Sequence, residues 1–228
     1  MKRFKRNHGA RSNALIVPDY IIEFLNVYDG FAIAPSATDV IILKGNFHFK
    51  RTYKHTNEIE DSYELSIRVP ADFPKSVPTV IEIGGKIPRD GTNHINPDDT
   101  LCLGSPLRQL INVSENPSLI DFVEILLVPY LYAVSNKLKN NENFIFGELA
   151  HGSNGELSDY ESLFGVKGKL AVANVLEALA TKKRIANKRL CPCGCGIRLG
   201  CCKLHYKINP FRKISTKSSF KKFATKFQ

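Results

Sequence analysis

Two short segments between positions 63 and 83 constrain the fold more than any other part of the sequence. Residues 63–69 alternate apolar and polar side chains with a period of two, as in a strand with one buried face, and Pro70 ends the pattern. Residues 79–83 form a second strand pattern that ends at Gly84 and Gly85. Because the connection between the two segments is short, we expect consecutive antiparallel strands in a meander.

Helix and strand patterns elsewhere place this meander within a mixed fold. The patterns lie, in chain order, at residues 20–28 (helix), 39–43 and 47–49 (strands on either side of Gly45 and Asn46), 119–138 (helix) and 168–189 (helix). Pro129 lies inside the apolar 119–138 helix, where we expect it to kink or split the helix. Residues 144–160 contain three glycines and indicate irregular structure. The order predicts an α+β domain, with an antiparallel meander sheet packed by helices on one face.

The positive charge of the chain is concentrated at its C-terminal end. The formal net charge is +10, yet residues 178–228 hold 14 Lys and Arg with no acidic residue, whereas residues 1–177 hold the other 18 together with all 22 Asp and Glu. The end of the chain is therefore a separate functional unit. Residues 207–228 mix basic side chains with Phe, which suits phosphate contacts with base stacking as well as an acidic protein face. Because no nucleic-acid-binding fold motif accompanies the charge, we favour a protein partner.

The composition indicates a protein of the cytoplasm. No run of 18 or more apolar residues occurs, so we expect no transmembrane helix and no membrane contact. The basic residues 1–6 are not followed by the apolar stretch of a secretory signal. In a cytoplasmic protein, six Cys indicate metal binding or thiol chemistry rather than disulfides.

Cys102 is the only cysteine in the first 190 residues, and it follows a cluster of polar residues in an expected loop. The loop, residues 93–104, also carries His94, Asn96, Asp98 and Asp99. A thiol at a loop end on a rigid scaffold can act as a nucleophile toward a partner. Free Cys is also typical of buried positions, where it behaves as a small apolar side chain. The local sequence leaves both interpretations open.

Acyl transfer to Cys102 would need groups that stabilise a tetrahedral oxyanion and that handle protons. Asn96 is the side-chain candidate for the oxyanion, and the backbone N–H groups of the Leu103-Gly104 step are the alternative. His94 is either a general base or a residue that holds the loop through its ring nitrogens. The two aspartates can orient an incoming amine, or they are ordinary turn residues.

The order of motifs around this cysteine resembles that of ubiquitin-conjugating enzymes. A strand is followed by Phe73-Pro74 and by a second strand, and then come His94-Ile95-Asn96 and Leu101-Cys102-Leu103. These are similar to the His-Pro-Asn signature and the active-site triplet of the family, and residues 118–129 are similar to its next helix. Ile95 stands where the family has Pro, and His94 lies closer to the cysteine than in eukaryotic members. The resemblance implies a ubiquitin-conjugating-like fold with Cys102 as the catalytic thiol.

A second likeness is to the bacterial members of that group. Residues 146–155, with Tyr160 and residues 163–165, resemble the end of ubiquitin-conjugating-like proteins found in antiphage operons of the CBASS type. The resemblance implies a domain over residues 1–165 that forms a thioester with the C-terminus of a cGAS-like nucleotidyltransferase. No Gly-rich nucleotide site occurs in the sequence, so the acyl group would come from a separate activating enzyme or from the partner itself. The alternatives are a non-catalytic adaptor, which the presence of Cys102 disfavours, and a basic zinc protein that binds protein or nucleic acid.

Five Cys and one His lie within residues 191–205. Thiolates with an imidazole are the ligands that tetrahedral Zn²⁺ selects, and a closed set of four would make a structural site. A structural zinc can fold a module that is too small for a core of its own. We therefore predict a zinc-binding module at residues 191–206, after a helical linker at 166–190 and before a basic tail at 207–228.

The cysteine cluster resembles the SEC-C motif, in which Cys-x-Cys-Gly-x-Gly is followed by an adjacent Cys pair. The resemblance implies four zinc ligands, Cys191, Cys193, Cys201 and Cys202. It places Cys195 at a small position that does not bind the metal. The gap between the two cysteine pairs is one residue shorter than in the family pattern. A ligand set in which His205 replaces Cys201 therefore stays open.

Overall fold

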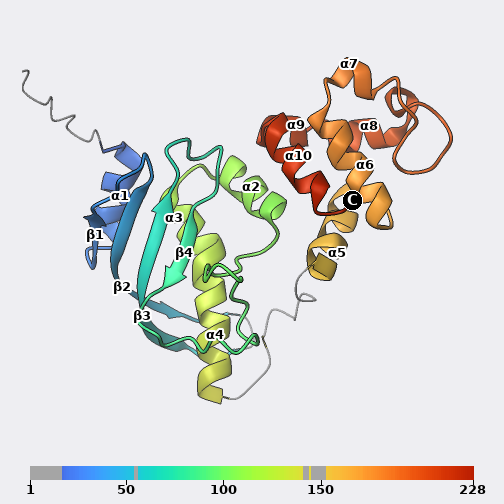
Figure 1. Ribbon diagram of the computed structural model, residues 1–228. Helices are drawn as coiled ribbons and strands as arrows, with labels where there is room; N and C mark the ends of the chain where they lie inside the picture. Colours follow the sequence, from blue (N-terminus) through green and yellow to red (C-terminus); the bar gives the residue numbers. More distant parts are fainter. Residues whose placement is uncertain (1–16, 54–55, 141–143, 145–152) are drawn as a thin grey trace, which may run out of the picture.

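The computed structural model describes residues 17–53, 56–140, 144 and 153–228. Over these residues the protein is α+β, with a four-stranded antiparallel sheet and helices (Figure 1). The sheet has the order β1-β2-β3-β4, and its strands are β1 Phe31–Ala34, β2 Ile41–Arg51, β3 Ile59–Val69 and β4 Thr79–Glu82. The predicted antiparallel meander is confirmed.

A first group of helices packs with this sheet. It comprises α1 Asp19–Val27, α2 Pro106–Glu115, α3 Leu119–Phe122, the π-helical segment η1 Val123–Leu127 and α4 Val128–Asn140. Side chains alternate along a strand, so Leu43 and Phe47 of β2 point to the same face as Leu65 of β3. These side chains form one core with Phe24 of α1 and Leu131 of α4. The helices therefore cover one face of the sheet.

The sequence pattern does not predict strand β1. Strand β2, which pairs with β1, is longer than expected. Gly45 and Asn46, expected between two strands, lie inside β2, where Gly45 is opposite Phe31. The two strands are very close here, since a Cβ atom on Gly45 would lie 2.1 Å from the carbonyl oxygen of Gly30. The glycine marks a close approach of two backbones rather than a turn.

The helix expected over residues 119–138 is confirmed as a continuous helical stretch, Leu119–Asn140. Its middle segment η1 is π-helical, and α4 begins directly after it with Pro129 as its second residue. A proline offers no N–H, and its ring clashes with the carbonyl group four residues earlier. A π turn is wider than an α turn and gives that ring room. The effect expected of Pro129, a kink or split, is therefore a local widening of the helix in segment η1.

This helical stretch is long and apolar enough to cross a membrane, judged by length and composition over the described residues. In the fold, 67% of its most apolar 18-residue window is buried. Leu127, Leu131 and Val134 lie in the core under the sheet. Packing inside the protein accounts for the composition of this helix.

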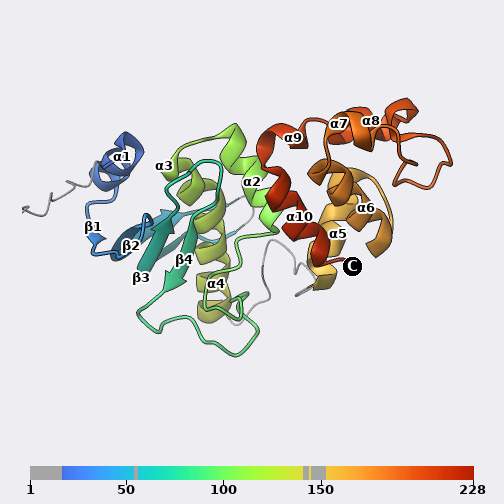
Figure 2. The ribbon, with the colours of Figure 1, turned by 45° about the horizontal axis from the view of Figure 1, so that its top comes forward.

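Residues 153–228 form a second, helical group, which we call the C-terminal unit (Figures 1 and 2). Its elements are α5 Ser153–Phe164, α6 Lys169–Ala180, α7 Lys183–Ala186, the 3-10 segment η2 Leu199–Cys201, α8 Lys203–Ile208, α9 Phe211–Ile214 and α10 Lys217–Thr225. They enclose a second core, which includes Tyr160, Leu176 and Phe220. Residues 153–160, expected to be irregular, thus belong to helix α5.

The basic end of the chain is folded in this unit. Residues 207–228, expected to be a tail, form the end of α8 and all of α9 and α10. Phe220 and Phe227 are 1% and 4% exposed. These two rings, which suggested base stacking, pack in the second core instead. The lysines of the same segment stay on the surface, because a helix separates an apolar stripe from a charged one.

Arg212 lies where the helix expected over residues 168–189 stops. Its guanidinium group donates hydrogen bonds to the carbonyl oxygens of Ala178, Leu179 and Thr181 at 2.6, 3.0 and 2.8 Å. Carbonyl groups at the C-terminal end of a helix lack N–H partners from the helix itself. A cation from α9 therefore caps α6, and the chain continues separately as α7. The 166–190 segment, expected to be a linker, contributes α6 to the middle of the second core.

Helix α2 joins the two cores. The loop expected at residues 93–104 ends directly before this helix, where Ser105 followed by Pro106 is a typical N-cap and first-turn pair. Val113 of α2 packs in the core under the sheet, and Leu107 packs in the second core. Both views show α2 between the sheet and helix α10 (Figures 1 and 2). The C-terminal unit is thereby held against the sheet domain.

We predict that Gly45→Ala destabilises the protein by about 3 kcal/mol, the upper end of the range for overpacked sites. The added methyl group would meet the backbone of Gly30 and Phe31, which cannot move without breaking the pairing of β1 with β2. Urea unfolding followed by circular dichroism measures the change. Lys44→Ala, at the exposed neighbouring position, is the control and is expected to change stability by less than about 0.5 kcal/mol. Equal effects of the two substitutions would contradict the close approach.

Candidate active site and metal centre

Residues 94–102 form a tight hairpin that presents Cys102. The Cys102 N–H donates to the His94 carbonyl oxygen at 2.8 Å, and the Asn96 N–H donates to the Thr100 carbonyl oxygen at 2.8 Å. The Asp99 N–H donates to the Asn96 carbonyl oxygen at 2.9 Å and closes the turn. The hairpin therefore sets His94 and Cys102 opposite each other at its open end.

The two aspartates of the turn have different surroundings. The Asp98 carboxylate accepts hydrogen bonds from the Thr100 hydroxyl and N–H groups at 2.6 and 3.2 Å, and the hydroxyl bond holds the pKa of Asp98 below its ordinary value. Asp99 has a positive φ of 65° and accepts a hydrogen bond from Arg89 at 2.8 Å. Arg89 also donates to the carbonyl oxygen of Glu82 at the end of β4. Both aspartates thus shape the turn.

Helix α4 anchors the other end of the hairpin to the core. The Tyr130 hydroxyl donates to the Asn93 carbonyl oxygen at 2.7 Å, and the Lys137 ammonium group donates to the Thr92 carbonyl oxygen at 2.6 Å. Burial raises the pKa of Tyr130, with a smaller electrostatic contribution from Cys102. The loop that carries Cys102 rests on a rigid helix.

Cys102 is partly exposed and lines a cavity of about 880 Å³, which we call the Cys102 groove. One wall is the hairpin and the start of α2, including His94, Asn96, Asp98, Gly104, Ser105 and Gln109. The other wall belongs to the C-terminal unit and includes Glu156, Asp159, Lys226 and Phe227. The groove thus lies between the two halves of the molecule.

The structure brings the three residues suggested for catalysis, Cys102, His94 and Asn96, to this one groove. The His94 ring packs edge-on against Phe144, with 4.6 Å between ring centroids. The Asn96 side-chain amide donates to the Thr100 hydroxyl at 2.9 Å. One of the two amide hydrogens of Asn96 is therefore engaged in the turn, and the other is available to a ligand.

Backbone N–H groups next to the thiol are a second source of donors. Across the described part of the chain, the N–H groups of Leu103 and Gly104 have no hydrogen-bond acceptor. Gly104 has a φ of 112°, a backbone conformation that residues other than glycine rarely adopt. Its carbonyl group is fixed by the Gln109 side chain, which donates to it at 2.7 Å. The backbone after Cys102 thus offers donors on a held loop, as an oxyanion would require.

Asp159 is a groove residue that the sequence did not indicate. Its carboxylate, 11% exposed, accepts hydrogen bonds from the Ser105 hydroxyl and from the Arg108 guanidinium group. The contact raises the pKa of Arg108. Beside it, the Lys226 ammonium group pairs with Glu156 at 3.1 Å. These partners lie more than 50 positions apart in the sequence, so no local pattern could have found them.

Four cysteine thiols gather at a second place, in a hairpin of residues 189–199 that we call the cysteine hairpin, together with the start of α8. The sulfur atoms of Cys191, Cys193, Cys195 and Cys202 all lie within 4.8 Å of one another. The Sγ–Sγ distances are 3.2 Å for Cys191–Cys193 and 3.7 Å for both Cys193–Cys202 and Cys195–Cys202. A tetrahedral zinc with Zn–S bonds of about 2.3 Å has S–S edges of about 3.8 Å. The group can hold a metal ion, and its dimensions fit tetrahedral zinc.

Backbone turns bring these thiols together. The Cys191 N–H donates to the Ile197 carbonyl oxygen at 2.8 Å and the Gly194 N–H donates to the Cys191 carbonyl oxygen at 3.1 Å. Gly194 and Gly196 have φ values of 79° and 76°, which turn the chain on each side of Cys195. The sequence spacing alone did not reveal that these turns carry the Cys195 thiol into the group.

The structure leaves Cys201 and His205 outside this group. Cys201 is exposed at the end of η2 and is not among the clustered thiols of the described residues. The His205 ring nitrogens face Asn187 at 3.0 Å and Asn209 at 2.8 Å. The ligand set that the SEC-C resemblance implies and its His205 alternative therefore both differ from the observed group, in which Cys195 takes the fourth place.

The clustered thiols differ in pKa, and the segment around them is positively charged. Burial raises the pKa of Cys191, and the hydrogen bond from the Cys191 thiol lowers the pKa of Cys193 to about 7. Four thiolates around Zn²⁺ carry a net charge of about −2. Residues 178–228 hold 14 basic side chains and no acidic one, so this negative charge would be placed in a strongly positive segment.

Comparison with known proteins adds no family to this description. No protein-family model matches the chain, and no curated protein matches it.

We predict that Cys195→Ser weakens zinc binding by more than about 100-fold, because it removes one of four ligands. Cys201→Ser is the matched control, since it removes an exposed thiol six positions away, and it is expected to retain one zinc per chain. Competition with a chromophoric chelator, together with elemental analysis, measures both. A loss of zinc from the Cys201 variant with retention in the Cys195 variant would restore the SEC-C ligand set.

Proposed function

We propose that this protein is a ubiquitin-conjugating-like acyltransferase that carries the C-terminus of a partner protein as a thioester on Cys102. The observation that carries the proposal is the position of Cys102. Its thiol is partly exposed in the groove, on a loop anchored by Tyr130, beside His94 and Asn96. A thiol that only filled space would not need a groove of this size or unengaged N–H groups beside it.

The arrangement of elements supports the same class. A helix, a four-stranded antiparallel meander, a cysteine loop and a long apolar helix follow in that order. The sequence resemblance to ubiquitin-conjugating enzymes rests on the later part of this order, from strand β3 to the long helix. In addition, the C-terminal unit can hold a metal ion, which we propose to be a structural zinc bound by Cys191, Cys193, Cys195 and Cys202.

The chemistry has two steps. The Cys102 thiolate attacks the carbonyl carbon of an acyl group carried as a thioester by a separate activating enzyme, and the donor cysteine leaves as a thiolate. An amine then attacks the Cys102 thioester, a proton passes from the amine to a base, and the Cys102 thiolate leaves as an amide forms. Both steps pass through an oxyanion, for which the Leu103 and Gly104 N–H groups and the Asn96 amide are the donors.

Asp98 is the carboxylate best placed to receive the proton of the amine. It lines the groove, whereas Asp99 is held by Arg89. The hydrogen bond from Thr100 lowers the pKa of Asp98 and keeps it ionised at neutral pH. His94 serves the loop through its backbone carbonyl group, which accepts the Cys102 N–H, so its part in the reaction is to position the thiol.

The partner follows from the sequence resemblance alone. We propose a cGAS-like nucleotidyltransferase whose C-terminus is joined to Cys102 in antiphage defence. Attaching and releasing such a partner use the same thiol, because the thioester is the intermediate in both directions.

We predict that the protein, purified from its native host without added thiol, carries an acyl adduct on Cys102 that excess thiol or hydroxylamine cleaves. Intact-mass spectrometry before and after this cleavage identifies the mass of the partner. Cys102→Ala is expected to abolish the adduct, because the acyl acceptor is lost. Cys201→Ala is the matched control, an exposed cysteine outside the metal group, and should retain the adduct. Persistence of the adduct in the Cys102 variant would refute the proposal.

We predict that Asn96→Ala slows discharge of the thioester to an amine by about 100-fold, as for loss of one oxyanion donor. Thr100→Val is the control for the turn, because it removes the hydrogen bonds of the Thr100 hydroxyl with Asn96 and Asp98 but leaves the Asn96 amide in place. Its effect should be below about tenfold. Single-turnover discharge followed by gel under non-reducing conditions gives both rates, and equal slowing by both variants would reduce Asn96 to a turn residue.

A further inference from the structure

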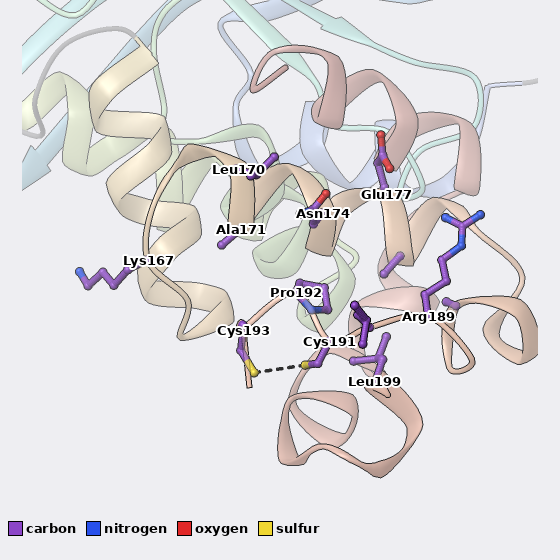
Figure 3. Close-up of a pocket in the computed structure, with 14 residues that line it drawn as sticks. Lys167, Leu170, Ala171, Asn174, Glu177, Arg189, Cys191, Pro192, Cys193 and Leu199 are labelled. Atoms are coloured by element: carbon purple, nitrogen blue, oxygen red, sulfur yellow. Dashed lines mark hydrogen bonds between the residues drawn. The ribbon is translucent and has the colours of Figure 1, made fainter. Parts of the chain in front are cut away.

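A second cavity lies in the C-terminal unit, away from the Cys102 groove. It has a volume of about 750 Å³ and runs between helix α6 and the cysteine hairpin. We call it the α6 groove. Leu170, Ala171 and Asn174 come from α6, and Arg189, Leu190 and Pro192 come from the hairpin. Figure 3 shows most of these side chains between the two elements.

The walls of the α6 groove expose large apolar side chains. Leu170 and Leu190 are 74% and 73% exposed, against 41% to 57% for the large apolar residues exposed in the sheet domain. Ile197, on the same hairpin, is 48% exposed. Exposed apolar side chains that line a cavity mark a binding surface more often than scattered ones do.

The charge around this groove is positive and largely uncompensated. Among the described residues, only Lys226 of the 14 basic side chains in residues 178–228 has an acidic partner within 4.0 Å. Arg189 lines the groove, Lys188 directly precedes it in the sequence, and Arg198 pairs with Leu190 in the hairpin. A partner that neutralises these cations would be attracted to this side of the unit.

The lining distinguishes between acidic partners. A nucleic acid offers phosphates but no aliphatic side chains to cover Leu170 and Leu190. Glu177 also lines the groove, where the Gln228 side chain donates to it at 2.6 Å, and it would repel a continuous phosphate backbone. A peptide can place an apolar or uncharged residue at that point and its carboxylates near Arg189.

We propose that the α6 groove binds a segment of a partner protein in which Asp and Glu alternate with large aliphatic side chains. The aliphatic residues cover Leu170 and Leu190, and the carboxylates pair with Arg189 and its basic neighbours. The cysteine hairpin is one wall of the groove, so the metal group holds this wall in place. The groove recruits the partner, and the Cys102 groove is a separate place for the reaction.

The test uses the full-length protein and a fluorescent synthetic peptide in which Asp and Glu alternate with Leu. Leu170→Ser and Leu190→Ser are each expected to weaken binding about tenfold, and Arg189→Glu to weaken it further. Val27→Ser, at an apolar residue 57% exposed on α1, is the control and should leave binding unchanged. Thermal unfolding of every variant checks that the fold is retained.

Three outcomes would overturn the proposal. They are equal binding of a peptide with Ser in place of Leu, tighter binding of a single-stranded oligonucleotide that competes with the peptide, and no effect of the two leucine substitutions. Cys102→Ala is expected to bind the peptide as the unaltered protein does. Peptide binding with no adduct on Cys102 would therefore leave this inference standing while the acyltransferase proposal failed.

Discussion

The shape of the molecule depends on the hydrogen bonds that the Asp159 carboxylate accepts. The carboxylate accepts them from Ser105 and Arg108 at the start of α2, and it comes from α5, on the other side of the groove. Ser105 directly follows Gly104, so the same contact sets the C-terminal unit against the loop that carries Cys102. Leu107 and Ile111 of the same helix also pack with the second core.

The C-terminal unit has an unusual electrostatic problem, because residues 178–228 contain no acidic side chain. Repulsion among 14 cations opposes a compact fold. Three features oppose that repulsion. Phe220 and Phe227 bury apolar surface. The Arg212 guanidinium group donates to carbonyl groups at the end of α6. The clustered thiols can become thiolates around a metal ion. A metal ion held by these thiols would therefore contribute to the folding of this unit as well as of its cysteine hairpin.

Periodic segments could be predicted from the sequence, and segments whose structure depends on distant partners could not. Residues 63–69 alternate regularly and are part of β3, and the apolar 119–138 pattern is the central helix. β1 has only four residues, and its pairing with β2 defines it as a strand. Gly45 reads as a turn until the neighbouring strand is present, since only then does the absence of a Cβ atom matter. The glycine-containing start of α5 is likewise helical, in a helix whose Tyr160 and Phe164 pack in the second core.

The same division applies to the two candidate sites. Residue types and spacing were sufficient to place a group of thiols that can hold a metal ion within residues 191–205, because thiols and imidazoles are rare and their chemistry is specific. Only the tertiary structure showed that Cys195, and not Cys201 or His205, joins the group of thiols. Positive φ angles at two glycines turn the Cys195 thiol inward, while Asn187 and Asn209 face the two ring nitrogens of His205. The second wall of the Cys102 groove likewise comes from residues more than 50 positions from Cys102, which no local pattern can bring together.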